Sequence, residues 1–169
     1  PNVKYWQINE EVGTPEMQED QVWALLQVNK VKLYVGAVYI RPVSRNTDST
    51  YATRFLMELQ AKILELQQQS KEVIILGDLN AKTDLSPNGI NPICKRGEQL
   101  INMCESCEVE IVNSVNKSDN HYTRIPHRVN ESPNTLDYIL CSGSMIEFHK
   151  FMNDPDRKSE IESDHVPIW

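Results

Sequence analysis

The sequence predicts a layered α/β fold in one domain, residues 1–169. Two runs, residues 22–28 and 32–40, alternate in polarity and are rich in β-branched and aromatic side chains, which is typical of paired strands. Apolar side chains then recur every three or four residues from Phe55 to Leu66, which predicts a helix with one buried face. A helix that leads into the short apolar run at residues 73–76 is typical of a layered α/β domain.

One antiparallel hairpin is expected near the start of the chain. The first twenty residues form a polar, acidic stretch ahead of it. The two strand-like runs are joined by Asn29-Lys30, which predicts a turn, and together they suggest a hairpin. Pro42 ends the second strand because proline cannot donate a hydrogen bond to a sheet.

The next predicted elements are a long helix and a central strand. Thr47, Asp48 or Ser49 can cap the N-terminus of this helix, and it is expected to end in the glutamine-rich residues 67–70. Residues 73–76 are wholly apolar, which favours a central place in a sheet, and they lead directly into Gly77.

The rest of the chain alternates loops, helices and strands. Proline and Asn-Gly signals predict a loop over residues 81–93, followed by a helix over 97–107 and a strand over 109–112. Further strand candidates are residues 122–123, 135–140 and 145–148. Residues 153–156 are expected to form a turn.

Composition narrows the classes of function. The net charge of −7 argues against tight sequence-blind binding to a polyanion, which needs clustered basic side chains. It does not exclude an enzyme that acts on phosphodiesters, because such an enzyme also holds metal ions with carboxylates. No apolar run approaches the roughly 20 residues of a membrane helix, so no membrane partner is expected. No signal sequence is seen, which favours a nuclear or cytoplasmic location, and Pro1 suggests a fragment or a processed product.

The four cysteines are expected to be ordinary thiols. Cys104 and Cys107 have the spacing of metal or redox ligands, but they fall in the predicted helix, and no second pair completes a zinc site. Reduced, partly buried thiols are therefore expected, with a metal or disulfide role as the alternative.

Candidate site residues follow the predicted strands. Asp78 and Asn80 come just after the apolar strand, where α/β proteins bind ligands, and they either hold a metal or water or satisfy a local turn. Asp137 is an acid inside an apolar strand, which requires a partner if that strand is central.

Two further sites each have a functional and a structural interpretation. Asp164 beside His165 forms either an acid–base pair or part of a surface loop. Tyr39 and Arg41 end the second strand of the hairpin, where the guanidinium either grips phosphate or covers the core. Local pattern alone leaves these alternatives open.

The order of these motifs resembles that of a known superfamily. They are Tyr39-x-Arg41-Pro42, then Gly77-Asp78-x-Asn80, then Thr123 followed by Leu136-Asp137-Tyr138, and finally Ser163-Asp164-His165-x-Pro167. This series resembles the endonuclease/exonuclease/phosphatase superfamily from about residue 22 to the end. Arg96-Gly97-x-x-Leu100 and Ile111-Val112-Asn113 are similar to the endonuclease domains of non-LTR retrotransposon, or endonuclease-reverse transcriptase, proteins. The resemblance implies a DNase-I-like sandwich of two mixed or antiparallel sheets flanked by helices.

The resemblance also implies a catalytic role for matching positions. Asp78 would orient or deprotonate the attacking water, and Asn80 would hold the same oxygen or the phosphate. His165 would contact the scissile phosphate and stabilise charge in the transition state, oriented by Asp137. Asp164 would bind metal or pair with His165.

Substrate contacts and a cofactor follow from the same resemblance. Tyr39 would lie against the phosphate, and Arg41, Thr123 and Ser132 would be substrate-side contacts. The implied cofactor is Mg²⁺, with Mn²⁺ as an alternative, which would neutralise the pentacovalent phosphate. The implied partner is DNA, nicked to leave a 3′-hydroxyl and a 5′-phosphate, and in a retrotransposon that 3′-hydroxyl primes reverse transcription.

The chain departs from the superfamily at its N-terminus. The motifs that carry an Asn and the principal metal-binding Glu are not present, so residues 1–169 are expected to form a single partial domain. We expect this chain alone to be inactive or nearly so, and to self-associate through exposed sheet edges. The alternatives are a phosphatase or RNA phosphodiesterase of the same superfamily, and a truncated, non-catalytic binding relative.

Overall fold

A computed structural model describes most of the chain. The described residues are 3–8, 15–28, 31–42, 50–69, 72–83, 93–115, 122–128, 130–142 and 163–165. Several expected features lie outside them: the turn at Asn29-Lys30, the helix caps at residues 47–49, the strand at 145–148, the turn at 153–156, and Pro167.

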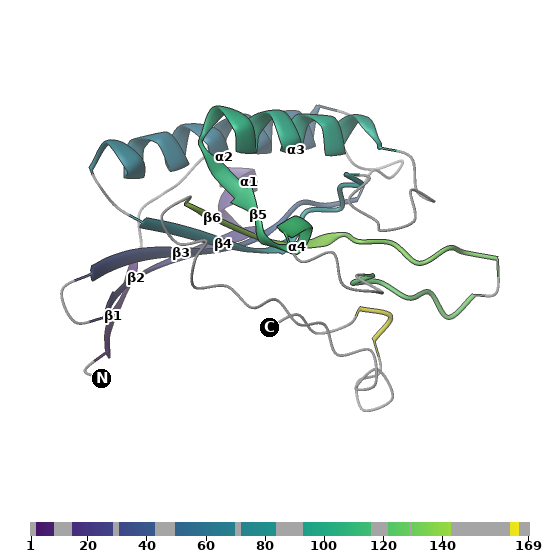
Figure 1. Cartoon of the computed structure of the whole chain (residues 1–169), viewed down its shortest axis with the longest axis horizontal. Coiled ribbons are helices and arrows are strands. Elements are labelled where there is room, and N and C mark those ends of the chain that lie inside the picture. The colour runs from purple at the N-terminus through teal and green to yellow at the C-terminus, as the bar shows by residue number, and fades with distance from the viewer. Residues whose placement is uncertain are drawn as a thin grey trace.

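A mixed six-stranded sheet forms the centre of the described structure (Figure 1). Its spatial order is β1-β2-β3-β4-β6-β5. The strands are β1 (Val3–Ile8), β2 (Gln21–Val28), β3 (Val31–Tyr39), β4 (Glu72–Asp78), β5 (Val109–Ile111) and β6 (Asp137–Ser142). The predicted hairpin is confirmed as the antiparallel pair of β2 and β3, and β4 is central, between β3 and β6.

The polar stretch ahead of the hairpin contains two elements that the sequence did not predict. β1 pairs antiparallel with β2 along its whole length, and the short helix α1 (Pro15–Gln18) follows it. Met17 of α1 is fully buried and joins the core. The acidic residues of this stretch lie after β1, whose six residues alternate too briefly to predict a strand without tertiary pairing.

The pairing of β3 with β4 brings the ends of two strands together. It is the parallel pair of this sheet, and α2 (Tyr51–Gln68) crosses over between its strands. Tyr39 and Asp78 occupy paired positions at the shared C-terminal end. Because β6 runs antiparallel to β4, Asp137 at its start lies opposite Asp78. Residues about 40 and 60 positions apart in sequence therefore meet at one edge.

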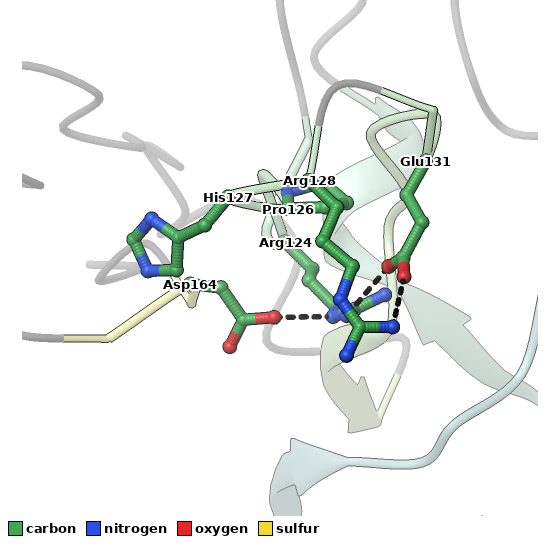
Figure 2. A pocket seen from close by; sticks show the side chains of 6 residues that line it. All are labelled: Arg124, Pro126, His127, Arg128, Glu131 and Asp164. Carbon is green, nitrogen blue, oxygen red and sulfur yellow. Dashed lines mark hydrogen bonds and ion pairs between the residues drawn. The ribbon is translucent and has the colours of Figure 1, made fainter.

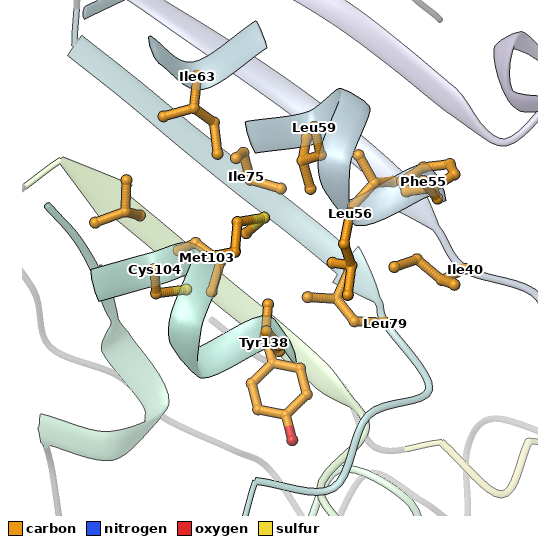
Figure 3. Close-up of a cluster of buried hydrophobic side chains, with 14 of the residues drawn as sticks. Ile40, Phe55, Leu56, Leu59, Ile63, Ile75, Leu79, Met103, Cys104 and Tyr138 are labelled. Atoms are coloured by element: carbon orange, nitrogen blue, oxygen red, sulfur yellow. The ribbon is translucent and has the colours of Figure 1, made fainter. Parts of the chain in front are cut away.

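The main core lies between this sheet and two helices. α2 and α3 (Lys95–Ser106) lie on the same face of the sheet, as Figure 1 shows. Figure 3 shows α2 side chains such as Phe55 and Leu59 in one buried cluster with Ile75 of β4 and Tyr138 of β6. The predicted stripe from Phe55 to Leu66 is the buried face of α2. Each of these large side chains contributes about 1.5–3 kcal/mol by leaving water.

The opposite face of the sheet is less covered. Alternate residues of β4 point there, and Leu76 is 37% exposed; Val22 of β2 is 59% exposed. A small cluster partly covers this face, where Val112 of α4 (Val112–Val115) packs with Cys141, Ile74 and Ile139. The alternation of β4 places Asp78 on this more open face.

The cysteines behave as the sequence predicts. Cys104 and Cys107 are free and buried, and burial raises the pKa of the Cys104 thiol to about 12. Cys94 is also free, and its sulfur caps α3 by accepting from the amide of Gly97. Burial and the raised pKa of the thiol are features of Cys104 and Cys107 that favour unreactive side chains.

The α/β class is confirmed, with some corrections. The described residues form one sheet, and the second sheet that the resemblance implies is not found among them. Val112, expected to end a strand, begins α4. The expected strand at residues 122–123 is reduced to isolated bridges of Arg124 with Asn134 and with His165. In the part of the chain described, no helix has the length and apolar character that spanning a membrane requires.

Candidate active site

Asp78 and Asn80 form a compact unit at the end of β4. The backbone amide of Asn80 donates to Asp78 Oδ1 at 2.9 Å, and its side-chain amide donates to Asp78 Oδ2 at 3.1 Å. The same Asn80 Nδ2 donates to the carbonyl of Ile40 at 3.0 Å, which ties it to the end of β3. Asn80 has a φ of 46°, a left-handed conformation that asparagine tolerates better than most residues. The carboxylate is therefore fixed in direction by the turn that follows it.

Gly77 makes this turn sterically possible. Its φ is 155°, and a Cβ at this position would lie 1.8 Å from the carbonyl oxygen of Val38. Only glycine allows β4 to approach β3 this closely immediately before Asp78.

Arg96 holds the same turn from the helix side. This arginine of α3 is buried, and its Nη1 donates to the carbonyl oxygens of Asn80 at 3.1 Å and Leu79 at 3.4 Å. It is also among the positive charges near Asp78. A buried guanidinium with backbone acceptors thus fixes the turn that carries both predicted site residues.

Asp137 and His165 form the second unit. His165 Nδ1 lies 2.9 Å from Asp137 Oδ2 and 3.2 Å from Oδ1. An ionised carboxylate only accepts hydrogen bonds, so Nδ1 carries the proton, and a neutral ring then leaves Nε2 as an acceptor. The Asp137 side chain is 19% exposed and that of His165 33%, so the pair lies at the rim of the structure. Asp137 lies in an otherwise apolar strand, where a buried carboxylate requires a hydrogen-bond partner, and His165 is that partner.

The two units meet. Asp78, Asp137 and His165 each offer one ligand atom, and these atoms lie within 4.8 Å of one another. Two carboxylates at one point suit a hard divalent cation such as Mg²⁺, which is bound by one or two carboxylates and completes its shell with water and phosphate. The residues present therefore fit such an ion, through the oxygens of Asp78 and Asp137.

The electrostatics of Asp78 agree with this fit. Burial raises its pKa above the ordinary value; the hydrogen bond from Asn80 lowers it, and the charge of Asp137 raises it further. A half-buried carboxylate beside a second one gains most from a nearby positive charge.

Comparison with known proteins places this geometry in a family. Residues 33–169 match the family model described as endonuclease-reverse transcriptase. The chain belongs to this family. Its nuclease-type fold lies within the endonuclease/exonuclease/phosphatase superfamily. A search of curated protein sequences found no match.

Solved structures share the fold of this endonuclease-reverse transcriptase family member. The endonuclease domain of TRAS1, a telomere-specific non-LTR retrotransposon, is similar with a TM-score of 0.70 and 18% identity over 99% of this chain. The AP endonuclease LMAP from Leishmania major gives 0.70 and 13% over 88%, and the catalytic domain of Xenopus laevis APE2 gives 0.69 and 22% over 95%. The chain spans 65%, 53% and 59% of the lengths of these three structures.

Asp164 lies apart from the cluster of Asp78, Asp137 and His165. Its Oδ2 accepts from Arg124 Nε at 2.7 Å. Burial opposes its ionisation, but the hydrogen bond and charge of Arg124 outweigh burial and hold the pKa of Asp164 below its ordinary value. Arg124 and Asp164 line a pocket of about 300 Å³ with Pro126, His127, Arg128 and Glu131 (Figure 2). Metal binding by Asp164 stays a prediction.

Tyr39 and Arg41 flank the site differently. Tyr39 is 42% exposed at the end of β3, beside Asp78 in the pairing of the sheet. Arg41 instead pairs with Asp20 at 2.7 Å, and its guanidinium lies 5.6 Å from the ring centroid of Tyr51. Tyr51 also donates to Asp20 at 2.6 Å, so this group ties the end of β3 to the start of α2.

Thr123 and Ser132, the two other predicted substrate contacts, differ in how far they are exposed. Thr123 is fully buried, and its hydroxyl accepts from the amides of Leu136 at 2.9 Å and Asp137 at 3.0 Å. In this structure it shapes the backbone that carries Asp137, and it presents no surface. Ser132 is exposed. Their roles toward a substrate stay predictions.

Local pattern did not assign roles to three residues that build the site. Arg96 and Asn113 appeared only within stretches of family resemblance, and Arg124 was not singled out. Asn113 donates to the carbonyl of Asp137 at 2.9 Å and accepts from the amide of Ile139 at 2.9 Å, which fixes the start of β6. For Asn113 the usable signal is a polar residue that follows an apolar run, because a buried polar group requires a partner.

Proposed function

We propose that this chain carries the active-site residues of a divalent-metal-dependent phosphodiesterase that nicks DNA in a retroelement-like protein. The observation that carries the proposal is the meeting of Asp78, Asp137 and His165 within 4.8 Å. Carboxylates, an imidazole and an amide at one point form the set of groups that phosphodiester hydrolysis needs.

Each residue has a role that follows from its contacts. Asp137 accepts from Nδ1 of His165, which leaves Nε2 to contact a phosphate oxygen and, when protonated, to stabilise developing negative charge. Asp78 orients the attacking water and accepts its proton, since the carboxylate is fixed by Asn80. The side-chain amide of Asn80 donates to Asp78 and Ile40 in this structure, and it would exchange one of these bonds for the same oxygen or for the phosphate.

The proposed cofactor is Mg²⁺, with Mn²⁺ as an alternative. Asp78 and Asp137 would hold it, and Asp164, which is held by Arg124 in this structure, is a further candidate ligand. When bound, the ion supplies positive charge that offsets the charge of the pentacovalent phosphate.

DNA is the proposed substrate because the similar folds described above include an AP endonuclease and the endonuclease domain of a retrotransposon. The net charge of −7 favours a substrate held at a local site over wide sequence-blind binding. Self-association through the open face and edges of the sheet is part of the proposal, and an intracellular location, nuclear or cytoplasmic, accompanies it.

Metal binding is the first test, because it needs no turnover. Mn²⁺ should broaden the NMR signals of Asp78 and His165 before those of remote residues, and Asp78→Asn should weaken this effect by roughly 10-fold or more. Met57→Gln, on the exposed side of α2, is the matched control and should change nothing. Mn²⁺ broadening that is no stronger at the site than elsewhere contradicts the metal site.

Strand nicking is the second test. Supercoiled DNA and a single-stranded RNA of equal charge are incubated with Mg²⁺ and the chain, and with Asp78→Ala and His165→Ala. Faster cleavage of DNA, lost in both variants, supports the proposal. Cleavage of RNA alone supports the RNA phosphodiesterase. Metal binding with cleavage of neither substrate agrees with the inactivity expected of this chain alone and leaves the non-catalytic binding relative as the alternative.

A further inference from the structure

Arg124 joins two acidic residues that are distant in sequence. Its Nε donates to Asp164 Oδ2 at 2.7 Å, and its Nη2 donates to Glu131 Oε2 at 3.2 Å. Figure 2 shows the guanidinium between the two carboxylates on the wall of the pocket. A planar guanidinium presents several donors in fixed directions, so one arginine bonds both acids at once, which a lysine ammonium on a flexible stem does less well.

The backbone around Arg124 reinforces this link. The amide of Ile125 donates to the carbonyl of Asp164 at 2.7 Å, and Arg124 forms an antiparallel bridge with His165. On its other side, Arg124 exchanges two backbone hydrogen bonds with Asn134, at 2.8 and 2.9 Å. Arg124 therefore lies between Asn134 and the segment 163–165.

Segment 163–165 is anchored at two points within the described part of the chain. Asp164 is held by Arg124 and Ile125, and the next residue, His165, is held by Asp137. Because adjacent side chains leave a short segment in different directions, fixing Asp164 also limits the rotation of His165. The imidazole ring of His165 is then already oriented toward Asp137, so less conformational entropy is lost when their hydrogen bond forms.

We infer that Arg124 is a positioning residue that holds Asp164 so that His165 stays against Asp137. This inference rests on the proposed function, in which His165 contacts the phosphate. Direct binding of substrate phosphate by Arg124 is the competing role. The contacts favour positioning, because two of its three nitrogens already donate to carboxylates.

The variants are chosen to separate these roles. Arg124→Gln removes the charge and the fork, whereas Arg124→Lys keeps the charge. Arg128→Gln is the matched control, because Arg128 lines the same pocket and pairs with Glu131 at 3.5 Å, yet makes no ion pair with Asp164 in the described structure. Asp164→Asn removes the partner and serves as a second route if Arg124→Gln does not fold.

The first measurement is the NMR spectrum of selectively labelled histidines at fixed pH. We expect Arg124→Gln and Asp164→Asn to shift and broaden the ring signals of His165, Arg124→Lys to do so less, and Arg128→Gln to leave them unchanged. Unchanged His165 signals in folded Arg124→Gln overturn the inference, as does an equal change in Arg128→Gln. This measurement needs no turnover, so failure of the proposed hydrolysis would leave it valid.

The second measurement is the rate of strand nicking, if the chain nicks. Loss of positioning should lower kcat by roughly 10- to 100-fold. KM should stay within about twofold, and Arg124→Lys should recover part of the loss. A rise in KM with unchanged kcat assigns Arg124 to substrate binding and overturns positioning.

Discussion

The two halves of the candidate site are held by different physical means. Asp78 belongs to a central strand and is fixed by Gly77, by the turn at Asn80 and by the buried Arg96. His165 belongs to a short segment held by the ion pair of Arg124 with Asp164 and by the hydrogen bond of His165 with Asp137, and these side chains are between 19% and 33% exposed. Backbone packing is insensitive to solvent conditions, whereas partly exposed ion pairs respond to salt and pH. The Asp78 half should therefore be as stable as the fold, whereas the position of His165 should depend on salt and pH.

The largest expected effect comes from Gly77→Ala, which disrupts the backbone packing that fixes Asp78. A Cβ there would lie 1.8 Å from the Val38 carbonyl, on a backbone that L-residues rarely adopt. We expect a loss of about 3–5 kcal/mol in the free energy of unfolding, measured by urea denaturation.

Gly36→Ala is the graded control for this substitution. Its Cβ would meet the ring of Trp23 at 2.9 Å, which is a side chain and not a strand backbone, so a smaller loss of about 1–3 kcal/mol is expected. If Gly77→Ala proved milder than Gly36→Ala, the close approach of β3 and β4 would be wrong.

Arg96→Met has the next largest expected effect. It leaves the carbonyls of Leu79 and Asn80 without their donor in a buried place, which should cost about 1–3 kcal/mol. The loss should be the same at low and high salt, because buried groups are poorly screened. Arg96→Lys should recover part of it, and exposed Lys95→Met should cost little. If the loss of stability disappeared in high salt, Arg96 would act as a screened ion pair, as the contacts around His165 do.

The smallest effects should have opposite signs in the two halves when pH is varied. The folded-state pKa of Asp78 is raised above the ordinary 3.8, so its folded form holds the proton more tightly, and stability falls as pH rises through that window. Asp78→Asn should therefore be more stable than the parent at neutral pH. The folded-state pKa of Asp164 is lowered, so its stabilisation is present above the ordinary value and is lost as pH falls through the folded pKa. Asp164→Asn should be less stable at neutral pH, by no more than about 1 kcal/mol.

Thermal unfolding of both variants from pH 7 to acid tests this contrast. Both differences from the parent should vanish once the carboxyls are protonated. Glu105→Gln, on the exposed side of α3, controls for the loss of one negative charge. Changes of the same sign in Asp78→Asn and Asp164→Asn would remove the distinction between the two halves.

Much of this fold could be predicted because its signals are local. The stripe from Phe55 to Leu66 follows from helical spacing, and the hairpin of β2 and β3 follows from alternation. β1 escaped prediction because its alternation is short and its strand character depends on pairing with β2. The helical start at Val112 was missed for a similar reason, since β-branched residues favour strands when taken alone.

The site was less predictable than the fold. A strand end pointed to Asp78, an acid inside an apolar strand pointed to Asp137, and the order of motifs pointed to His165, but no local pattern reports which side chains meet. Thr123 and Arg124 show the limit. They are adjacent, yet the first is buried beneath the Asp137 backbone and the second crosses to Asp164. Such pairings depend on how distant segments pack, which a single sequence does not encode in its spacing.

The parallel pairing of β3 with β4 makes the position of Asp78 an all-or-none property. A shift of β4 by one residue would turn every side chain to the other face: Val73 and Ile75 would leave the core, and Asp78 would turn toward the helices. Partial slippage is thus excluded by the same apolar residues that hold the helices. Every variant that keeps a folded core therefore has Asp78 at the site. A variant with a shifted β4 would unfold, and it would not show a graded decline in activity.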